Sequence, residues 1–534
     1  MARTKLSNIL HLQDSFKRVL REERAGRKLL PDILCFTDQQ VNQNDILDRI
    51  AKSLDSKSYS PLPFLTMAIP RDNYCTRPGT AFPLQDLVTY DAFANYIGRS
   101  ANPKLDARVF SYRFNKSGEL IPGVRQWTTF ENSSFKAFDW SDPDACILQS
   151  DITSYFANIN LNILQDTILT ILNGSSRTNE RIVDALLNSL LRPWAHGAIQ
   201  SNLGIPQGVD ASSILGNLFL HHLDAKISKI PGTKYFRFVD DIRIITPGKV
   251  TAKTTLMQLI DTLAEIGLDP NSSKTRILDS EEARALRDPR TEDMALVDKL
   301  IRSKNRANVS IAQPILMRIF HEAFNDHLLY RRHLSFAINR FVILHNLLKG
   351  NRRFVASTSK VLLSHLEQRP GCTREFSRFF RYFPSLTSGV QLVDFLQSAD
   401  NIYAWQEMWI LDSLLRFQRI TPSALRAFEE TAKDVTKHEM CRSKAILLAG
   451  KFGDHHVRHE LATMYNDGLD LVIKRAIVFA CQDLAQAERN TFYDMVAKNR
   501  EMRHIVKYVT SLRKPKYCEE EYWTPLDIPD WGTY

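Results

Sequence analysis

Hydrophobic and polar positions follow two different patterns along the chain, and the change lies near residue 280. Before that point, short runs rich in β-branched and aromatic residues alternate with longer amphipathic stretches. The runs are "FLTMAI", "RVFSYRF", "CILQSDI" and "FRFVDDIRII", and the stretches include "LNILQDTILTIL" and "ASSILGNLFLHHLDAKI". Short apolar runs are typical of strands, and apolar positions three and four apart are typical of helices. The first part is therefore predicted to be an α+β domain.

After residue 280 the strand-like runs disappear. From Glu281 to about Leu512 the sequence reads as amphipathic helices of ordinary length, separated by breaks such as "RPGC", "FPSLTSG" and "KFGD". Helices of similar length in series predict an α-helical repeat or an irregular bundle, although the sequence has no clean period. The last segment, from Arg513, is rich in proline, charge and aromatic residues and is predicted to be extended.

Length and composition narrow the class of protein. At 534 residues the chain exceeds what one hydrophobic core usually serves, so two or three domains are expected. The formal charge of +10 is compatible with a nucleic-acid partner. Seven scattered cysteines without a CxxC pair argue against a disulfide framework and a structural zinc site. No signal peptide or membrane-length apolar run is present, so we expect a cytoplasmic protein without a membrane partner.

Two adjacent carboxylates interrupt the strongest strand-like run, "YFRFVDDIRIIT". Asp240 and Asp241 repel each other and lose hydration among apolar neighbours, which makes the pair costly. At the tip of a hairpin they could bind a hard divalent cation that neutralises them. A solvated acidic turn is the alternative, and it would be preferred if the motif stood alone.

A second acidic position lies upstream, in "CILQSDITSYFANIN", where Asp151 ends an apolar run. Two strands that each end in an aspartate, side by side, would form a two-metal clamp for phosphate chemistry. Between them, "GIPQGVDASSILGNLFLHHLD" places a glycine–proline turn before a helix rich in small residues, a surface on which a base pair can lie closely.

This ordered set resembles the palm of reverse transcriptases over roughly residues 60 to 280. Asp151 with Phe156 resembles the first catalytic motif, "GIPQG" with Ser212, Leu215 and Asn217 the second, and "FVDD" the YxDD box, with Phe238 in place of the usual Tyr. "LIDTLAEIGLDPNSSKTRIL" resembles the helix–turn–strand motif that follows the box. "AIPRDNYCTRPGTAFPLQDLVTYDAFANYI" resembles the fingers of the intron and retron branches.

The resemblance assigns a role to each matched residue. Asp151, Asp240 and Asp241 are implied to be catalytic and to hold two Mg²⁺ ions, for which Mn²⁺ can substitute, together with the main-chain carbonyl of Ile152. The residues implied to contact the dNTP are Arg71, Arg77, Phe156, Gln207 and Lys274. Among them, Phe156 takes the place of the steric gate against a ribose 2′-OH, Gln207 faces the nascent base pair, and the three cations lie near the triphosphate.

The helical second half resembles that of the abortive-infection and related phage-defence reverse transcriptases, in which a HEAT-like helical domain follows the palm. On this basis we predict five segments: an N-terminal helical extension (1–58), fingers (59–145), palm (146–280), α-helical domain (281–512) and an extended tail (513–534). Members of that group form trimers or hexamers. Some extend single-stranded DNA from one of their own tyrosines, some use no template, and others use a partner noncoding RNA.

Protein priming needs a hydroxyl that can reach the metal pair, and no thumb is recognisable after residue 280. The candidate priming residues are Tyr534, Tyr522, Tyr517, Tyr59 and Tyr74. Tyr534 follows Gly532 near the end of the sequence, where backbone freedom favours entry into the cleft. Packing of the tail on the helical domain is the alternative reading.

Other functions stay open. A retron- or group II intron-like enzyme would copy RNA from a nucleic-acid primer. A non-catalytic nucleic-acid-binding scaffold would be expected to have lost an aspartate or the "PQG" turn, and neither is lost. In "REFSRFFRYF", Arg374, Arg378 and Arg381 could track a phosphate backbone while the rings stack on bases, although an amphipathic helix that buries its rings is favoured.

Overall fold

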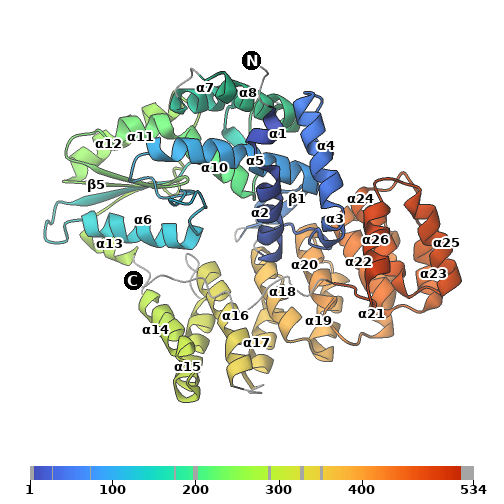
Figure 1. Cartoon of the computed structure of the whole chain (residues 1–534). Coiled ribbons are helices and arrows are strands. Elements are labelled where there is room, and N and C mark those ends of the chain that lie inside the picture. The colour runs from blue at the N-terminus through green and yellow to red at the C-terminus, as the bar shows by residue number, and fades with distance from the viewer. Residues whose placement is uncertain are drawn as a thin grey trace.

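The computed structural model describes residues 5–26, 28–71, 74–172, 176–195, 202–286, 290–324, 330–348 and 353–518. Within these ranges the fold is α+β, with strands confined to the first part of the chain and a long helical region after them (Figure 1). The last described strand ends at Leu278, so the predicted change of pattern near residue 280 is confirmed. Tyr522 and Tyr534 lie outside the described residues.

The first part begins with short helices that pack around one long helix. The elements up to the sheet are α1 (Leu6–Ile9), α2 (Leu12–Arg24), α3 (Thr37–Gln40), α4 (Gln43–Asp55), β1 (Leu65–Pro70), β2 (Thr76–Ala81), α5 (Leu84–Ala101), η1 (Asn102–Lys104) and α6 (Gly123–Ala137). Helices α2 and α4 both contact α5, which is almost entirely buried. Strands β1 and β2 form a separate antiparallel hairpin, called here the fingers hairpin.

A four-stranded antiparallel sheet, in the order β4-β5-β3-β6, forms the centre of the predicted palm. Its strands are β3 (Cys146–Ser150), β4 (Lys234–Phe238), β5 (Asp241–Thr246) and β6 (Arg276–Leu278). The helical elements between and after these strands are η2 (Tyr155–Asn158), α7 (Leu161–Ile171), α8 (Arg177–Leu186), η3 (Leu187–Leu191), α9 (Arg192–Ala195), α10 (Asp210–Phe219), α11 (His221–Ile227), α12 (Lys249–Ala264) and α13 (Ser280–Ala285). Apolar side chains of β3 and β5 alternate between two cores, one under α10 and one under α6.

One predicted strand is wrong. The run "RVFSYRF" contains only isolated bridges, from Val109 to Arg237 and from Phe114 to Leu120. A left-handed residue, Tyr112 with φ of 49°, turns the chain away after the first bridge. The segment therefore touches the edge strand β4 at a single parallel bridge and forms no ladder of its own.

The helical region runs from α14 onward, and sequence neighbours pack against each other. Its elements are α14 (Thr291–Arg302), α15 (Arg306–Glu322), α16 (Tyr330–Leu347), α17 (Arg353–Ser364), η4 (Pro370–Cys372), α18 (Thr373–Tyr382), α19 (Leu386–Leu396), α20 (Ala404–Leu414), α21 (Pro422–Lys433), α22 (Glu439–Phe452), α23 (His455–Thr463), α24 (Leu471–Ala480), η5 (Cys481–Asp483), α25 (Gln486–Ala497) and α26 (Arg503–Ser511). Figure 1 shows these helices as an arc along one side of the first part.

The hydrophobic cores do not follow the predicted segments. The fingers hairpin buries Met67 and Ile69 in the core of the helical region, together with Leu30 and Leu34 of the N-terminal segment. Helix α5 lies instead in the palm core, and α6 covers the other face of the sheet. Trp405 of α20 adds a direct link, since its Nε1 donates to the carbonyl of Leu29 at 2.8 Å. The hairpin is therefore held by the helical region.

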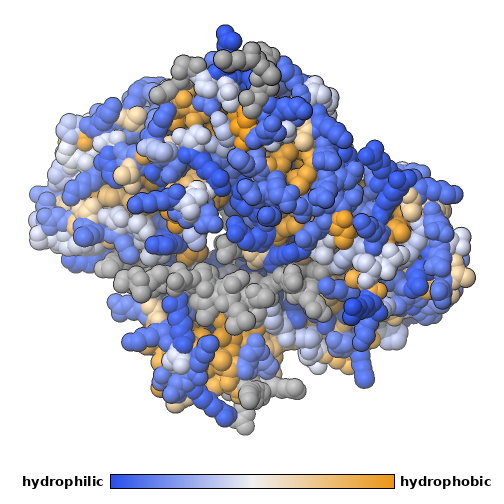
Figure 2. Space-filling model, in the orientation of Figure 1, coloured by the Kyte–Doolittle hydropathy of each residue, from blue (hydrophilic) through white to orange (hydrophobic). Residues whose placement is uncertain are grey.

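Hydrophilic residues cover most of the face seen in Figure 2, with hydrophobic groups gathered over the lower helices. Within the part of the chain that is described, every helix is too short or too polar to cross a membrane.

Candidate active site

The acidic pair lies at the tip of the β4–β5 hairpin, as predicted from the sequence. Phe238 and Asp241 are the last residues paired across the two strands, which leaves Val239 and Asp240 in the turn. Val239 has φ of 56°, a left-handed conformation that costs a β-branched residue about 1–2 kcal/mol. Such a conformation persists only where the surroundings fix it.

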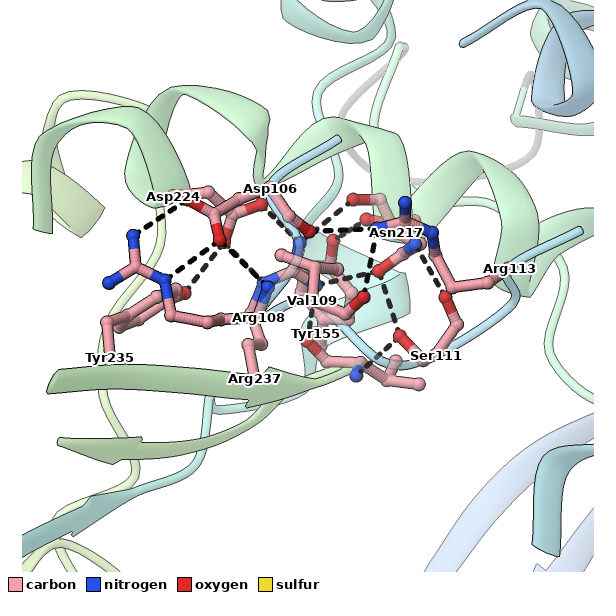
Figure 3. A network of polar contacts seen from close by, with 12 residues as sticks. Asp106, Arg108, Val109, Ser111, Arg113, Tyr155, Asn217, Asp224, Tyr235 and Arg237 are labelled. Atoms are coloured by element: carbon pink, nitrogen blue, oxygen red, sulfur yellow. Dashed lines mark hydrogen bonds and ion pairs between the residues drawn. The ribbon is translucent and has the colours of Figure 1, made fainter. Parts of the chain in front are cut away.

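Hydrogen bonds from buried side chains fix this turn, and Ser111, Asn217 and Arg237 are labelled among them in Figure 3. The backbone N–H of Val239 donates to Oγ of Ser111 at 2.9 Å, and its carbonyl accepts from Nη1 of Arg237 at 2.9 Å. Oγ of Ser111 in turn donates to Oδ1 of Asn217 on α10 at 2.8 Å. Both polar groups of the strained residue are thus satisfied by buried side chains, and the segment that carries Ser111 supports the turn.

A buried ion pair anchors the same network. Nη2 of Arg237 lies 2.5 Å from Oδ2 of Asp224, and the two side chains are 0% and 2% exposed. The hydroxyl of Tyr235 donates to Oδ1 of Asp224 at 2.7 Å. Although burial opposes it, Asp224 raises the pKa of Arg237, so the guanidinium stays charged. Loss of one partner of such a pair leaves a buried charge and costs roughly 3–5 kcal/mol.

Strand register brings the third aspartate to the pair. Ser150 is opposite Ile242 in the β3–β5 ladder, so Asp151, one residue further, lies beside Asp241. The backbone N–H of Asn271 donates to the carbonyl of Asp151 at 2.7 Å, and Nζ of Lys274 lies 2.6 Å from Oδ2 of Asp151. The structure therefore brings together the three predicted aspartates and the predicted lysine.

The electrostatics of the site are those of a cation site. Burial, followed by repulsion from Asp151, raises the pKa of Asp240 to about 6. Burial and repulsion from Asp240 and Asp151 raise the pKa of Asp241 to about 7. Lys274 and Arg243 are cations that act on Asp241. Although partial burial opposes it, contact with Asp151 raises the pKa of Lys274. More positive charge is needed to hold all three carboxylates ionised.

The donor set fits a hard divalent cation. Carboxylate and carbonyl oxygens are the ligands that Mg²⁺ and Mn²⁺ prefer. No donor within the described ranges hydrogen-bonds to the carbonyl of Ile152, which leaves this predicted ligand available. In the described part of the chain no three acidic, histidine or cysteine side chains are already in a metal-binding arrangement. The ammonium of Lys274 contacts Oδ2 of Asp151, and Nδ2 of Asn271 donates to the same oxygen at 3.4 Å, so a bound cation would require these contacts to change.

Phe156 lies beside the "GIPQG" loop. A Cβ added to Gly216 of α10 would lie 3.1 Å from its ring, and the backbone N–H of Ile205 donates to its carbonyl at 2.9 Å. Gly204 has φ of 88°, and a Cβ added to it would lie 3.1 Å from the carbonyl oxygen of Ala157. Gln207, half-buried on the same loop, has no hydrogen-bond partner among the described residues. The Phe156 ring therefore lies beside the loop that carries Gln207.

Arg71 and Arg77 lie elsewhere, on the fingers hairpin. Arg71 directly follows β1 and Arg77 belongs to β2. Between the described residues, no hydrogen bond or ion pair joins either arginine to the aspartates. Their assignment to the triphosphate stays a prediction.

The candidate priming tyrosines differ in accessibility. Tyr59 is buried and its hydroxyl donates to Oδ1 of Asp86 at 2.5 Å. Tyr517 is also buried and donates to Oδ2 of Asp483 at 2.7 Å. Tyr74 is 57% exposed at the tip of the fingers hairpin. Of the three candidates that are described, Tyr74 has the accessible phenol.

Residues 93–286 match the family model described as "Reverse transcriptase (RNA-dependent DNA polymerase)". This part of the chain is a reverse transcriptase domain. The domain indicates an RNA-directed DNA polymerase, which is a nucleotidyltransferase, and domains of this kind use divalent metal ions. It contains all three aspartates, Phe156, Gln207 and Lys274, whereas Arg71 and Arg77 lie before it.

Solved structures similar to this chain include telomerases. A truncated apo telomerase from Candida tropicalis is 16% identical, with 40% of this chain and 50% of that chain covered and a TM-score of 0.30. A telomerase from Candida albicans in complex with a fragment of telomeric RNA is 11% identical, with 70% and 66% covered and a TM-score of 0.33. Apo telomerase from Candida tropicalis is 13% identical, with 70% of each chain covered and a TM-score of 0.31. The chain thus spans between 50% and 70% of the length of these proteins. Curated proteins gave no match.

Sequence reasoning missed some of the residues that support the turn that carries Asp240. Arg237 could have been suspected, because an arginine inside a buried strand needs a counter-ion. Ser111 carries no comparable signal, whereas Asn271 lies within the helix–turn–strand motif that follows the acidic pair. In "REFSRFFRYF", Phe376, Phe379 and Phe380 are buried, so they cannot stack on bases, and the favoured amphipathic interpretation describes this helix.

Proposed function

We propose that this protein is a DNA polymerase of the reverse transcriptase type that acts in antiphage defence and synthesises single-stranded DNA from dNTPs. The observation that carries the polymerase assignment is the meeting of Asp151, Asp240 and Asp241 with Lys274 at one sheet end, inside a reverse transcriptase domain. A scaffold that had lost catalysis would not need to keep this costly arrangement of charges.

In the proposed reaction Asp151, Asp240 and Asp241 hold two Mg²⁺ ions, or Mn²⁺, with the carbonyl of Ile152. The ions would lower the pKa of the attacking hydroxyl and stabilise the leaving oxygen. Lys274 neutralises phosphate charge, and the turn at Val239 keeps Asp240 next to Asp241 and Asp151. Phe156 excludes a ribose 2′-OH, and Gln207 contacts the nascent base pair.

The defence role rests on the architecture: a reverse transcriptase domain followed by a long helical region, as in abortive-infection enzymes. We further propose protein priming from a tyrosine, with the product covalently attached, and synthesis either without a template or on a partner noncoding RNA. Among the described candidates, the exposure of Tyr74 favours it over Tyr59 and Tyr517. Assembly into trimers or hexamers in the cytoplasm and a HEAT-like character of the helical region belong to the same proposal.

The test is incorporation by the purified protein. Labelled dNTPs are added with Mg²⁺ and no nucleic acid, and any labelled peptide is located by mass spectrometry. Label on a tyrosine supports protein priming and names the residue, whereas synthesis that needs an added primer and RNA template favours the retron- or intron-like alternative. Asp240→Asn should abolish incorporation in either case, and undiminished synthesis by this variant would refute the polymerase assignment.

The defence role has its own test. Cells that express the wild-type protein should restrict phage replication or stop growing on infection, and cells that express Asp240→Asn should not. Equal protection by the wild type and by Asp240→Asn would contradict a defence role that depends on polymerase activity.

A further inference from the structure

The inner face of the fingers hairpin ends in an arginine that points at the helical region. Arg77 is opposite Ile69, and Gly79 is opposite Met67, so these four residues share one face. Met67 and Ile69 on this face are 3% and 1% exposed in the core of the helical region. Arg77 therefore lies half-buried at the edge of that core and not on an open surface.

Two arginines of the helical region, Arg331 and Arg374, act electrostatically on Arg77. Arg331 of α16 donates from Nη2 to the carbonyl of Gly371 at 2.6 Å, in the turn η4 that contacts β1. Arg374 follows on α18, where its Nη2 lies 2.7 Å from Oε1 of Glu375. The hairpin and two helices distant in sequence thus bring guanidinium groups to one junction.

Among the side chains that the structure describes, positive charge exceeds negative charge at this junction. Burial, with repulsion from Arg331, Arg71 and Arg374, lowers the pKa of Arg77 to about 10, and no described carboxylate acts against this. Arg77 has no hydrogen-bond or ion-pair partner among the described residues. Glu375 is the buried carboxylate nearby, and Arg374 and Arg331 hold its pKa below the usual value. Among the described residues, one carboxylate does not balance four guanidinium groups, which is costly where water is partly excluded.

We propose that Arg331 and Arg374 of the helical region complete, with Arg71 and Arg77 of the fingers hairpin, a binding site for phosphate groups. Guanidinium groups bind phosphate oxygens in a bidentate manner, and a phosphate would supply the missing negative charge. The proposal rests on the proposed polymerase function for the source of the phosphates, which are those of a dNTP or of the DNA backbone. It makes the helical region a part of the substrate site and not only a support.

The test measures binding without turnover. The affinity for dTTP is measured by calorimetry, and the affinity for fluorescein-labelled oligo(dT) by anisotropy at two salt concentrations. The variants are Arg331→Gln and the neutral pair Arg374→Gln with Glu375→Gln, which leaves no unpaired buried carboxylate. The control is Arg426→Gln on α21, an exposed arginine that loses the same charge outside the junction. Thermal unfolding confirms that each variant is folded.

We expect each junction variant to lower the affinity for one of the two ligands about tenfold, since a hydrogen bond to a charged group contributes about 1.5–3 kcal/mol. Weaker dTTP binding assigns the site to a triphosphate. Weaker oligo(dT) binding with a smaller salt dependence assigns it to the DNA backbone. Folded junction variants that bind both ligands as the control does would overturn the inference, as would a wild type that binds neither. Failure of the wild type to incorporate dNTPs would instead refute the proposed polymerase function, and the binding measurements would still decide on the site.

Discussion

Arg475 of α24 and Asp38 of α3 form a buried ion pair although 437 residues separate them in the chain. Nη2 of Arg475 lies 2.6 Å from Oδ1 of Asp38, and the side chains are 3% and 0% exposed. Nη1 of the same guanidinium lies 2.6 Å from Oδ2 of Asp32. Although burial opposes it, Arg475 together with His504 holds the pKa of Asp38 well below its usual value. The N-terminal segment is therefore fixed to the helical region by charge as well as by apolar packing.

Replacing Arg475 with Met should destabilise the protein strongly, because it leaves Asp32 and Asp38 buried without their counter-ion. We expect a loss of roughly 3–5 kcal/mol in the free energy of unfolding, measured by denaturant titration. The variant that also carries Asp32→Asn and Asp38→Asn should recover part of the loss. A single variant as stable as the wild type would show that this pair does not hold the two parts together.

Replacing Phe156 with Ala should change sugar selection. The smaller side chain opens room beside Gly216 for a ribose 2′-OH, so the use of ribonucleotides relative to deoxynucleotides should rise. The ratio of kcat/KM for the two sugars measures this, and Phe156→Tyr, which keeps the ring, is the matched control. Unchanged selectivity in an active Phe156→Ala enzyme would place the gate elsewhere.

Ser111 should act as a positioning residue for the catalytic turn. Ser111→Ala removes the acceptor for the N–H of Val239 and one partner of Asn217. We expect kcat to fall about tenfold, for the loss of about 1–2 kcal/mol of hydrogen bonding at the turn, with little change in the KM for dNTPs. Ser111→Thr keeps the hydroxyl and should restore kcat. An equal change in both kinetic constants, or no rescue by Thr, would contradict a positioning role.

Glu23 should make the stability depend on pH. It is 1% exposed on α2, and burial raises the pKa of its carboxyl to about 7 in the folded chain. The folded state therefore binds the proton more tightly than the unfolded state, so this stabilisation is complete below the unfolded pKa near 4.5 and is lost as the pH rises through 7.

Glu23→Gln removes this titration, because the amide cannot ionise and can still accept the hydrogen bond from the N–H of Asp32. The stability of the variant relative to wild type should increase between pH 5 and pH 8, by up to ~3 kcal/mol. Thermal unfolding at matched pH values measures the difference. A difference that is constant over this range would contradict the raised pKa.

The sequence was sufficient to predict that the three aspartates come together, because each of them lies in a short motif. Each aspartate ends or begins an apolar run, and antiparallel pairing of β3 with β5 then places Asp151 beside Asp241. The "RVFSYRF" run was misread because its composition is strand-like. Its bridge from Val109 to Arg237 is not extended into a ladder, since the chain turns at Tyr112.

Long-range partners could not be read from the sequence. The buried Arg237 signals that a counter-ion exists, but not that Asp224 on the preceding helix supplies it. Arg331 and Arg374 look like ordinary helix arginines until the hairpin that carries Arg77 is docked against them. The sequence also could not predict that the fingers hairpin joins the core of the helical region. A strand pattern shows which face is apolar and not which domain will cover that face.

The burial of the fingers hairpin in the core of the helical region has a consequence for the order of events during synthesis. Met67 and Ile69 leave the ribosome before the helices that cover them have been made, and Asp38 waits for a partner 437 residues later, roughly 20–90 s at about 5–20 residues per second. Until then the hairpin has no core to join. When all three aspartates have been synthesised, the fingers hairpin is therefore still not packed in its core. Polymerase activity should begin only when the helical region has been translated and folded.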